Sequence, residues 1–136
     1  MSRTQPDGSM IVKLRFLGKE STPTNSPTLY ASDQNSYVVQ GWIVTDPHIL
    51  ALLDICDEET VVEVPASLLA HLAGDGLSGV VGHQLPPIAH IKQNGNLIVR
   101  GRRVVDPEAL GAMDIPDHET CVEVPKAAMA ALLIGG

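Results

Sequence analysis

The sequence contains two copies of one 46-residue pattern, and this repeat constrains the fold more than any other feature. Residues 27–72 align with residues 87–132 without a gap, and 18 of the 46 aligned pairs are identical. We name these segments the first repeat and the second repeat. A unit of this length is short for a stable core without disulfides or metal. We therefore expect the two repeats to pack together about a pseudo-twofold axis.

Each repeat predicts the element order strand, strand, helix, strand, helix. Polar turns between apolar or β-branched runs favour a β-hairpin, and aspartate followed by proline is typical of a helix start. A β-branched run then predicts a strand, and a proline opens the last helix. In the first repeat the expected elements are strands 28–32 and 37–44, a two-turn helix from Asp46-Pro47, strand 60–64 and helix 65–72. Their counterparts in the second repeat are strands 88–91 and 97–105, a helix from Asp106-Pro107, strand 120–124 and a helix from Pro125 to about Leu133.

These elements predict an α+β fold in which an internal duplication of a ββαβα unit forms two pseudo-symmetric lobes. The first lobe spans 10–72 and carries an extra N-terminal strand at 10–17, where apolar residues alternate. The second lobe spans 87–136. The segment 73–86 holds four glycines and is expected to be a linker, and residues 1–9 a disordered tail.

Composition narrows the classes of function. The formal charge is −7 and aromatic residues make up only 3%, which disfavours nucleic-acid and anionic-membrane partners. Cys56 and Cys121 do not form the disulfide framework of a small secreted domain, so we expect a cytoplasmic location. The first apolar run is interrupted by Lys13 and Arg15, and neither a signal peptide nor a membrane span is expected.

The two repeats differ most in charge. The first repeat carries seven acids and no Lys or Arg, whereas the second carries six acids and five bases. The sharpest difference is in the second strand, where 40–43 reads Gln-Gly-Trp-Ile and 100–103 reads Arg-Gly-Arg-Arg. With a period of two, Arg100 and Arg102 share one sheet face and Arg103 lies on the other.

Two interpretations of this difference stay open. A solvated strand face tolerates either chemistry. Alternatively, Arg100 and Arg102 form an exposed basic strip and Gln40 and Trp42 an apolar contact surface, because Trp and Arg are enriched in interface hot spots. The strip would then meet an acidic partner or the acidic part of a second copy of the chain. Direct binding of nucleic acid through Arg100, Arg102 and Arg103 is disfavoured, because no aromatic residues accompany them.

Acidic turns precede the third strand of both repeats. Asp57, Glu58 and Glu59 are interpreted as an exposed rim that contributes to protein binding. Clustered carboxylates also suit hard cations, but the spacing does not match an EF-hand loop, and a turn before the next strand explains the carboxylates.

Motifs for metal binding and catalysis are absent from the sequence. No His or Cys pair has metal-ligand spacing, and no nucleophile elbow, phosphate loop or dinucleotide motif is present. We expect neither cofactor, metal nor catalytic residue.

Four sequence segments resemble known proteins: Phe16-Leu-Gly-Lys19, Ser26-Pro-Thr-Leu-Tyr30, Tyr37-Val-Val-Gln-Gly-Trp-Ile-Val-Thr-Asp-Pro47 and Glu59-Thr-Val-Val-Glu-Val-Pro65. They resemble a group of small uncharacterised actinobacterial proteins. The layout is also similar to a short domain of unknown function encoded beside helix-turn-helix regulators in actinobacterial developmental loci. The resemblance implies a non-enzymatic accessory protein that is a partner or antagonist of a DNA-binding regulator.

The sequence therefore favours an intracellular protein-interaction module that offers an acidic, Trp-bearing surface and an Arg-bearing surface to protein partners, with homo-oligomers as one alternative. A second hypothesis is a small-molecule- or metal-binding protein, or an enzyme, with a cleft between the two lobes.

Overall fold

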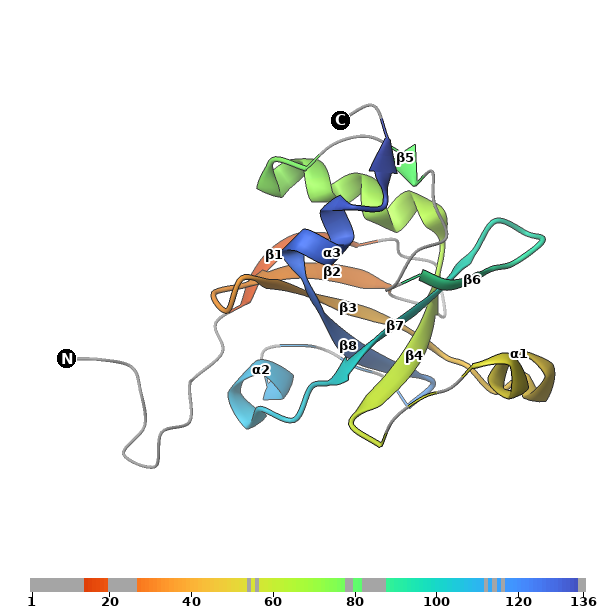
Figure 1. Ribbon diagram of the computed structural model, residues 1–136. Coiled ribbons are helices and arrows are strands. Elements are labelled where there is room, and N and C mark those ends of the chain that lie inside the picture. Colours follow the sequence, from red (N-terminus) through yellow and green to blue (C-terminus); the bar gives the residue numbers. More distant parts are fainter. Residues whose placement is uncertain are drawn as a thin grey trace.

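The computed structural model of the chain describes residues 14–19, 27–53, 55, 57–77, 80–81, 88–111, 113, 115 and 117–134. The expected tail at 1–9 lies outside the described residues, as do positions 10–13 of the expected first strand. Figure 1 shows strands that cross one another beneath helices, with α1 and α2 set apart from the others.

The expected order of elements is confirmed in both repeats. The first contains β2 (Thr28–Ser32), β3 (Ser36–Ile43), α1 (Pro47–Leu52), β4 (Glu59–Val64) and the 3-10 helix η1 (Ala66–Asp75). The second contains β6 (Ile88–Ile91), β7 (Leu97–Arg103), α2 (Pro107–Gly111), β8 (Glu119–Pro125) and α3 (Lys126–Ala130). Outside the repeats lie β1 (Leu14–Lys19), β5 (Val80–Val81) and β9 (Leu133–Ile134).

The α+β class is confirmed, and its main element is a seven-stranded antiparallel sheet. Its order is β1-β2-β3-β4-β7-β6, and β8 pairs with both β3 and β7. The strands β3, β4, β7 and β8 therefore close into a ring, to which β2 and β1 add on one side and β6 on the other.

Two separate lobes do not form, and this corrects the expected arrangement. Strand β3 of the first repeat pairs along its length with β8 of the second, and β7 pairs with β4 in the same way. The registers also correspond: Gln40 lies opposite Cys121, and Arg100, 60 positions further on, lies opposite Val61. The physical reason is that β3 is buried from Ser36 to Gly41, so both of its faces and both of its edges need partners.

The glycines inside the second strands mark close approaches of backbone, as the sequence indicates. A Cβ atom added to Gly41 would lie 2.6 Å from Glu63 O, and one added to Gly101 would lie 2.5 Å from Glu123 O. Beyond these points β3 pairs with β4 and β7 pairs with β8. The two glycines therefore allow the ring to close.

The described residues form three apolar clusters. The largest lies between the sheet and the pair η1 and α3, to which η1 contributes Leu68 and Leu72 and α3 contributes Met129. A fully buried side chain of this size contributes about 1.5–3 kcal/mol. The two smaller clusters lie on the other face of the sheet, where α1 covers Val61 and Ile98 and the segment after α2 covers Val38 and Cys121.

Each short helix is capped as its Asp-Pro sequence predicts. Asp46 Oδ1 accepts a hydrogen bond of 2.9 Å from His48 N, and Asp106 Oδ2 accepts one of 2.9 Å from Ala109 N. These side chains satisfy backbone donors that have no partner within the helix.

The segments that follow the repeats differ from the sequence-based expectation. The helix η1 runs to Asp75 and ends at Gly76 in the left-handed conformation (φ 88°), so it extends into the expected linker. The helix expected to reach Leu133 ends at Ala130, and Leu133 instead pairs with Val81 in the small β5-β9 sheet. The remaining linker positions, 78–79 and 82–86, lie outside the described residues.

Candidate functional site

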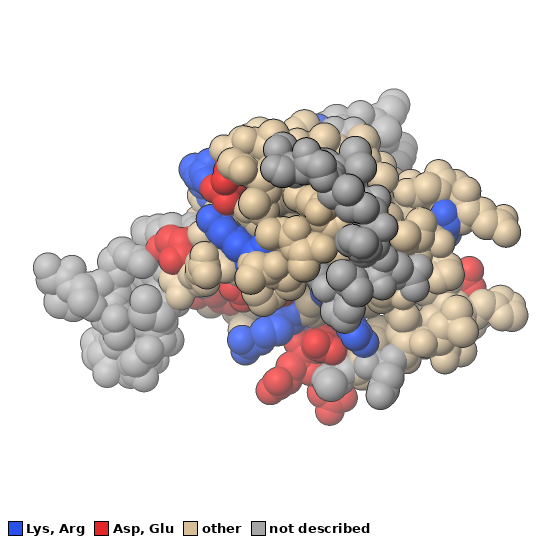
Figure 2. Space-filling model, turned by 45° about the horizontal axis from the view of Figure 1, so that its top comes forward, with Lys and Arg blue, Asp and Glu red and all other residues tan. Residues whose placement is uncertain are grey.

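Strand pairing brings together two groups of residues that the sequence places in different repeats. Arg102 on β7 lies directly opposite Glu59 on β4. Arg103 N donates a hydrogen bond of 2.8 Å to Glu58 O, and Arg103 Nε donates one of 3.1 Å to Asp57 O. Arg102, Arg103 and the acidic rim therefore lie together on one surface. Figure 2 shows blue and red side chains next to each other on the face that it presents.

Gln40 does not belong to an exposed contact surface, because it is buried with only 1% of its surface accessible. Its Nε2 donates a hydrogen bond of 2.7 Å to Glu119 Oε1, and the Glu119 side chain is itself fully buried. This position lies opposite Cys121 in the pairing of β3 with β8. The Gln40 side chain therefore links β3 of the first repeat to β8 of the second.

Trp42 and Arg100 are half-buried rather than exposed. Trp42 lies opposite Glu63 on β4 and Glu119 on β8, and its Nε1 has no hydrogen-bond partner among the described residues. The exposed basic residues of this region are therefore Arg102 and Arg103. The assignment of these residues to an interaction surface stays a prediction.

Exposed apolar side chains accompany both strand ends. On the first repeat, Ile43 at the end of β3 is 45% exposed and Leu52 on α1 is 70% exposed. On the second repeat, Val105 after β7 is 78% exposed, while Arg103 occupies the position that corresponds to Ile43. The two strand ends thus present an apolar surface and a basic surface at corresponding places.

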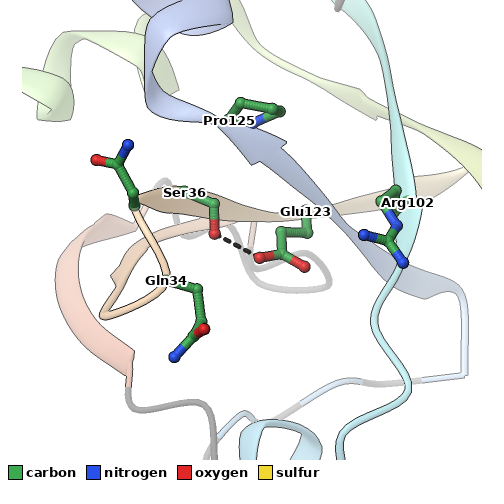
Figure 3. Close-up of a pocket in the computed structure, with 6 residues that line it drawn as sticks. Gln34, Ser36, Arg102, Glu123 and Pro125 are labelled. Carbon is green, nitrogen blue, oxygen red and sulfur yellow. Dashed lines mark hydrogen bonds between the residues drawn. The ribbon is translucent and has the colours of Figure 1, made fainter. Parts of the chain in front are cut away.

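A pocket of about 190 Å³ opens beside the β2-β3 turn (Figure 3). Its lining includes Gln34 and Ser36 from the turn region, Arg102 on β7 and Glu123 on β8. Ser36 Oγ donates a hydrogen bond of 2.5 Å to Glu123 Oε2. Arg102 and Glu123 lie opposite each other in register, and Figure 3 shows the guanidinium pointing toward the carboxylate.

The sequence-based reasoning missed this pocket, although one signal was available. Glu63 and Glu123 are identical in the two repeats, but Lys92 in the second repeat corresponds to Ser32 in the first. Lys92 Nζ lies 3.1 Å from Glu63 Oε1, and Asn96 Nδ2 donates a hydrogen bond of 2.8 Å to Glu63 Oε2. A glutamate that is identical in the two repeats but has different neighbouring residues could have indicated that the two positions differ in function.

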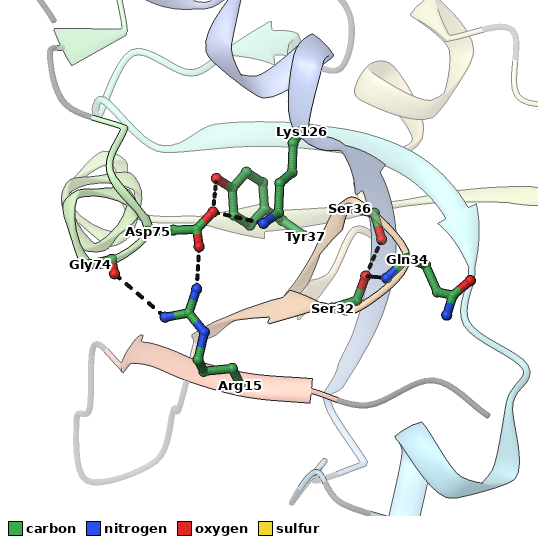
Figure 4. A network of polar contacts seen from close by, with 8 residues as sticks. All are labelled: Arg15, Ser32, Gln34, Ser36, Tyr37, Gly74, Asp75 and Lys126. Carbon is green, nitrogen blue, oxygen red and sulfur yellow. Dashed lines mark hydrogen bonds and ion pairs between the residues drawn. The ribbon is translucent and has the colours of Figure 1, made fainter. Parts of the chain in front are cut away.

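A second polar cluster joins four elements around Asp75 (Figure 4). Tyr37 Oη donates a hydrogen bond of 2.7 Å to Asp75 Oδ2, and Lys126 Nζ lies 2.9 Å from the same oxygen. Arg15 pairs with Asp75 Oδ1 and donates a hydrogen bond to Gly74 O. Lys126 also lies over the Tyr37 ring, 5.4 Å from its centroid.

These contacts shift two pKa values in opposite directions. The hydrogen bond from Lys126, followed by that from Tyr37, lowers the pKa of Asp75. Burial, with a further contribution from Asp75, raises the pKa of Tyr37. Every polar atom of this cluster that is named here already has a partner, so the arrangement suits the joining of β1, β3, η1 and α3 better than proton transfer.

The other described residues offer few candidates for metal binding or catalysis. The described residues contain no group of three or more His, Cys, Asp or Glu side chains able to hold a metal ion. Cys121 is buried, which raises the pKa of its thiol to about 11 and makes it a poor nucleophile. Among the described helices, none is long and apolar enough to cross a membrane.

The fold and the site together define a small α+β protein with an interleaved antiparallel sheet and a mixed apolar and charged surface at its strand ends. Comparisons with family models, with curated proteins and with solved structures find no match.

Proposed function

We propose that the chain is a non-catalytic protein-interaction module that binds through the ends of β3 and β7. The observation that carries this proposal is the difference between corresponding exposed positions, where Ile43 faces solvent in one repeat and Arg103 in the other. Interfaces combine apolar residues with arginine, so the two ends together fit a partner that has both an apolar and an acidic region.

The partner class that the resemblance implies is a DNA-binding regulator, and the module is its accessory partner or antagonist. The charge of −7 attracts a regulator whose DNA-binding surface is basic, while apolar and acidic regions of that regulator make the contacts with Ile43 and Arg103. The acidic rim at Asp57 and Glu58, which is exposed beside Arg103, supports this choice.

The test is affinity capture from the native cell with the wild-type chain and single-residue variants. Arg102→Glu and Ile43→Asp change exposed side chains, so both variants should stay folded at the assay temperature and lose the captured partner. Lys19→Glu reverses an exposed charge on β1 and serves as the matched control, which should retain the partner. The proposal is wrong if all four proteins capture the same set of proteins, or if Lys19→Glu loses the partner as well.

Self-association is measured on the same variants by sedimentation velocity. An oligomer that is broken by Arg102→Glu but not by Lys19→Glu would identify a second copy of the chain as the partner. A monomer at all concentrations would assign the surface to a different protein.

We also infer that the chain derives from duplication of a ββαβα unit. Three observations support this origin: the 18 identical pairs, the correspondence of the β3-β8 and β7-β4 registers, and the matched contacts at the strand ends. Ile43 N donates to His118 O at 3.0 Å, and Arg103 N donates to Glu58 O at 2.8 Å.

A further inference from the structure

We propose that the pocket between Glu123 and Arg102 binds a small zwitterion, with the ligand ammonium at Glu123 and the ligand carboxylate at Arg102. The chemical class is that of a single α-amino acid. This inference goes beyond the protein-interaction function and does not depend on it.

The other repeat shows which chemical group suits the glutamate. Glu63, the counterpart of Glu123, is contacted by the Lys92 ammonium at 3.1 Å and 3.2 Å and by the Asn96 amide at 2.8 Å. Glu123 receives only the Ser36 hydroxyl among the described residues. Ser36 corresponds to Asn96, so its hydroxyl takes the place of the Asn96 amide. Within the part of the chain that the structure describes, Glu123 therefore lacks only a partner that corresponds to the Lys92 ammonium.

The chain does not supply that ammonium from the corresponding position. Ser32 stands where the second repeat has Lys92, and it lies in the β2-β3 hairpin. Its hydroxyl is occupied, since it lies 2.6 Å from Ser36 Oγ and accepts a hydrogen bond of 3.0 Å from Gln34 N. A cation at Glu123 must therefore come from Arg102 or from a ligand.

Arg102 is placed to hold a carboxylate at the same time. Its side chain is exposed and makes no hydrogen bond or ion pair within the described part of the chain. Guanidinium groups bind carboxylates through two parallel N–H donors. A direct pair between the exposed Arg102 and the half-buried Glu123 would remain accessible to water and would contribute little stability, so a ligand that satisfies both groups can replace it.

The size of the pocket suits a ligand of about one amino acid. Its volume is about 190 Å³, and a neighbouring pocket of about 160 Å³ shares Arg102 and Glu123. Sites for drug-sized molecules are larger, about 300–1,000 Å³. The lining of the neighbouring pocket combines Val38, Val104 and Val105 with the charged residues Arg103 and Asp106, and the valines suit a short apolar side chain. Valine and alanine are therefore the first ligands to examine.

The experiment is a titration of the full chain followed by amide chemical shifts. L-Valine should cause saturable shifts at positions 34–36, 102 and 123, with a Kd on the order of 1 mM for an open site with two ion pairs. Methylammonium chloride and sodium acetate each offer one charge and should bind at least about tenfold more weakly, a difference of about 1.4 kcal/mol.

Variants separate the proposed roles. Glu123→Gln and Arg102→Gln should each weaken valine binding at least about tenfold. Glu63→Gln is the matched control in the other repeat and should bind valine as the wild type does. Arg102→Gln alters an exposed side chain without a partner, so it tests the proposal even if Glu123→Gln fails to fold.

Three results would overturn the proposal. The first is the absence of saturable shifts with valine and alanine. The second is methylammonium binding as tightly as valine, which would indicate a site for a lysine side chain or a simple amine. The third is unchanged valine binding in Arg102→Gln. Partner capture by Glu123→Gln should stay at the wild-type level, which keeps this test separate from that of the protein-interaction surface.

Discussion

The hydroxyl of Tyr37 donates a hydrogen bond of 2.7 Å to Asp75, and this contact joins the centre of the sheet to the end of η1. The same carboxylate pairs with Lys126 at the start of α3 and with Arg15 on β1. A single acid therefore connects four elements, including β1, which lies outside both repeats.

Stability should decrease at both ends of the pH range because of this cluster. Asp75 has a folded-state pKa below its ordinary value of 3.8, so its contribution is present above that value and is lost as the pH falls through the folded-state pKa. Tyr37 has a folded-state pKa above its ordinary value of 10.0, so its contribution is present below that value and is lost as the pH rises.

Urea unfolding at several pH values tests this prediction with two variants. Asp75→Asn should remove most of the acid decrease in the free energy of unfolding, and Tyr37→Phe should remove the alkaline decrease while keeping the acid one. Equal pH dependence in the wild type and both variants would contradict the assignment.

Replacement of either strand glycine by alanine should destabilise the fold. The added methyl group meets the backbone of Glu63 in Gly41→Ala and that of Glu123 in Gly101→Ala, and overpacking of this kind costs about 1–3 kcal/mol. Gly111→Ala on α2 is the control, because no atom lies within 4 Å of the new Cβ. It should be neutral or stabilising by up to about 1 kcal/mol, as measured by chemical unfolding. A strand variant as stable as Gly111→Ala would disprove the close approach.

The aspartate caps should contribute equally in the two repeats. Asp46→Ala removes the acceptor for His48 N and should cost about 0.5–2 kcal/mol in the free energy of unfolding. Asp46→Asn keeps a capping oxygen and should recover most of this loss. The same pair of variants at Asp106 should give similar values, since its side chain accepts from Ala109 N. A larger loss in the asparagine variant than in the alanine variant would argue against a capping role.

Cys121 should be unreactive in the folded protein. Its side chain is buried and its pKa is raised to about 11, so few thiolates form near pH 8. In a Cys56→Ser background, a disulfide reagent should detect no thiol in the native state and one after denaturation. Rapid reaction of the native Cys56→Ser protein would show that β8 opens or that the thiol is accessible.

Local features of the fold were predictable because neighbouring residues determine them. The Asp46-Pro47 and Asp106-Pro107 pairs contain both the cap and the constrained first helical residue. The turn at Asn94-Gly95 requires the left-handed conformation that Gly95 adopts (φ 89°). The presence of two repeats allowed each expectation of this kind to be made twice.

The pairing between repeats was not predictable in the same way. The alternation of side chains along β3 indicates which residues share a face, but it does not identify the strand beside them. Gln40 was expected to be exposed because the sequence does not show that β8 pairs with β3. For the same reason, the position of Arg102 opposite Glu59 and the pocket at Glu123 follow from the register of β7 against β4 and β8.

The interleaving of strands has a consequence for synthesis of the chain on the ribosome. Ser36 and Glu123 form a hydrogen bond although 87 residues separate them. Strands β3 and β4 therefore leave the ribosome long before β7 and β8 exist to cover their edges. Long-range pairing of this kind slows folding and exposes apolar strands to aggregation in the meantime. A nascent chain that has stalled before β8 should be a substrate for chaperones, whereas the finished protein should not.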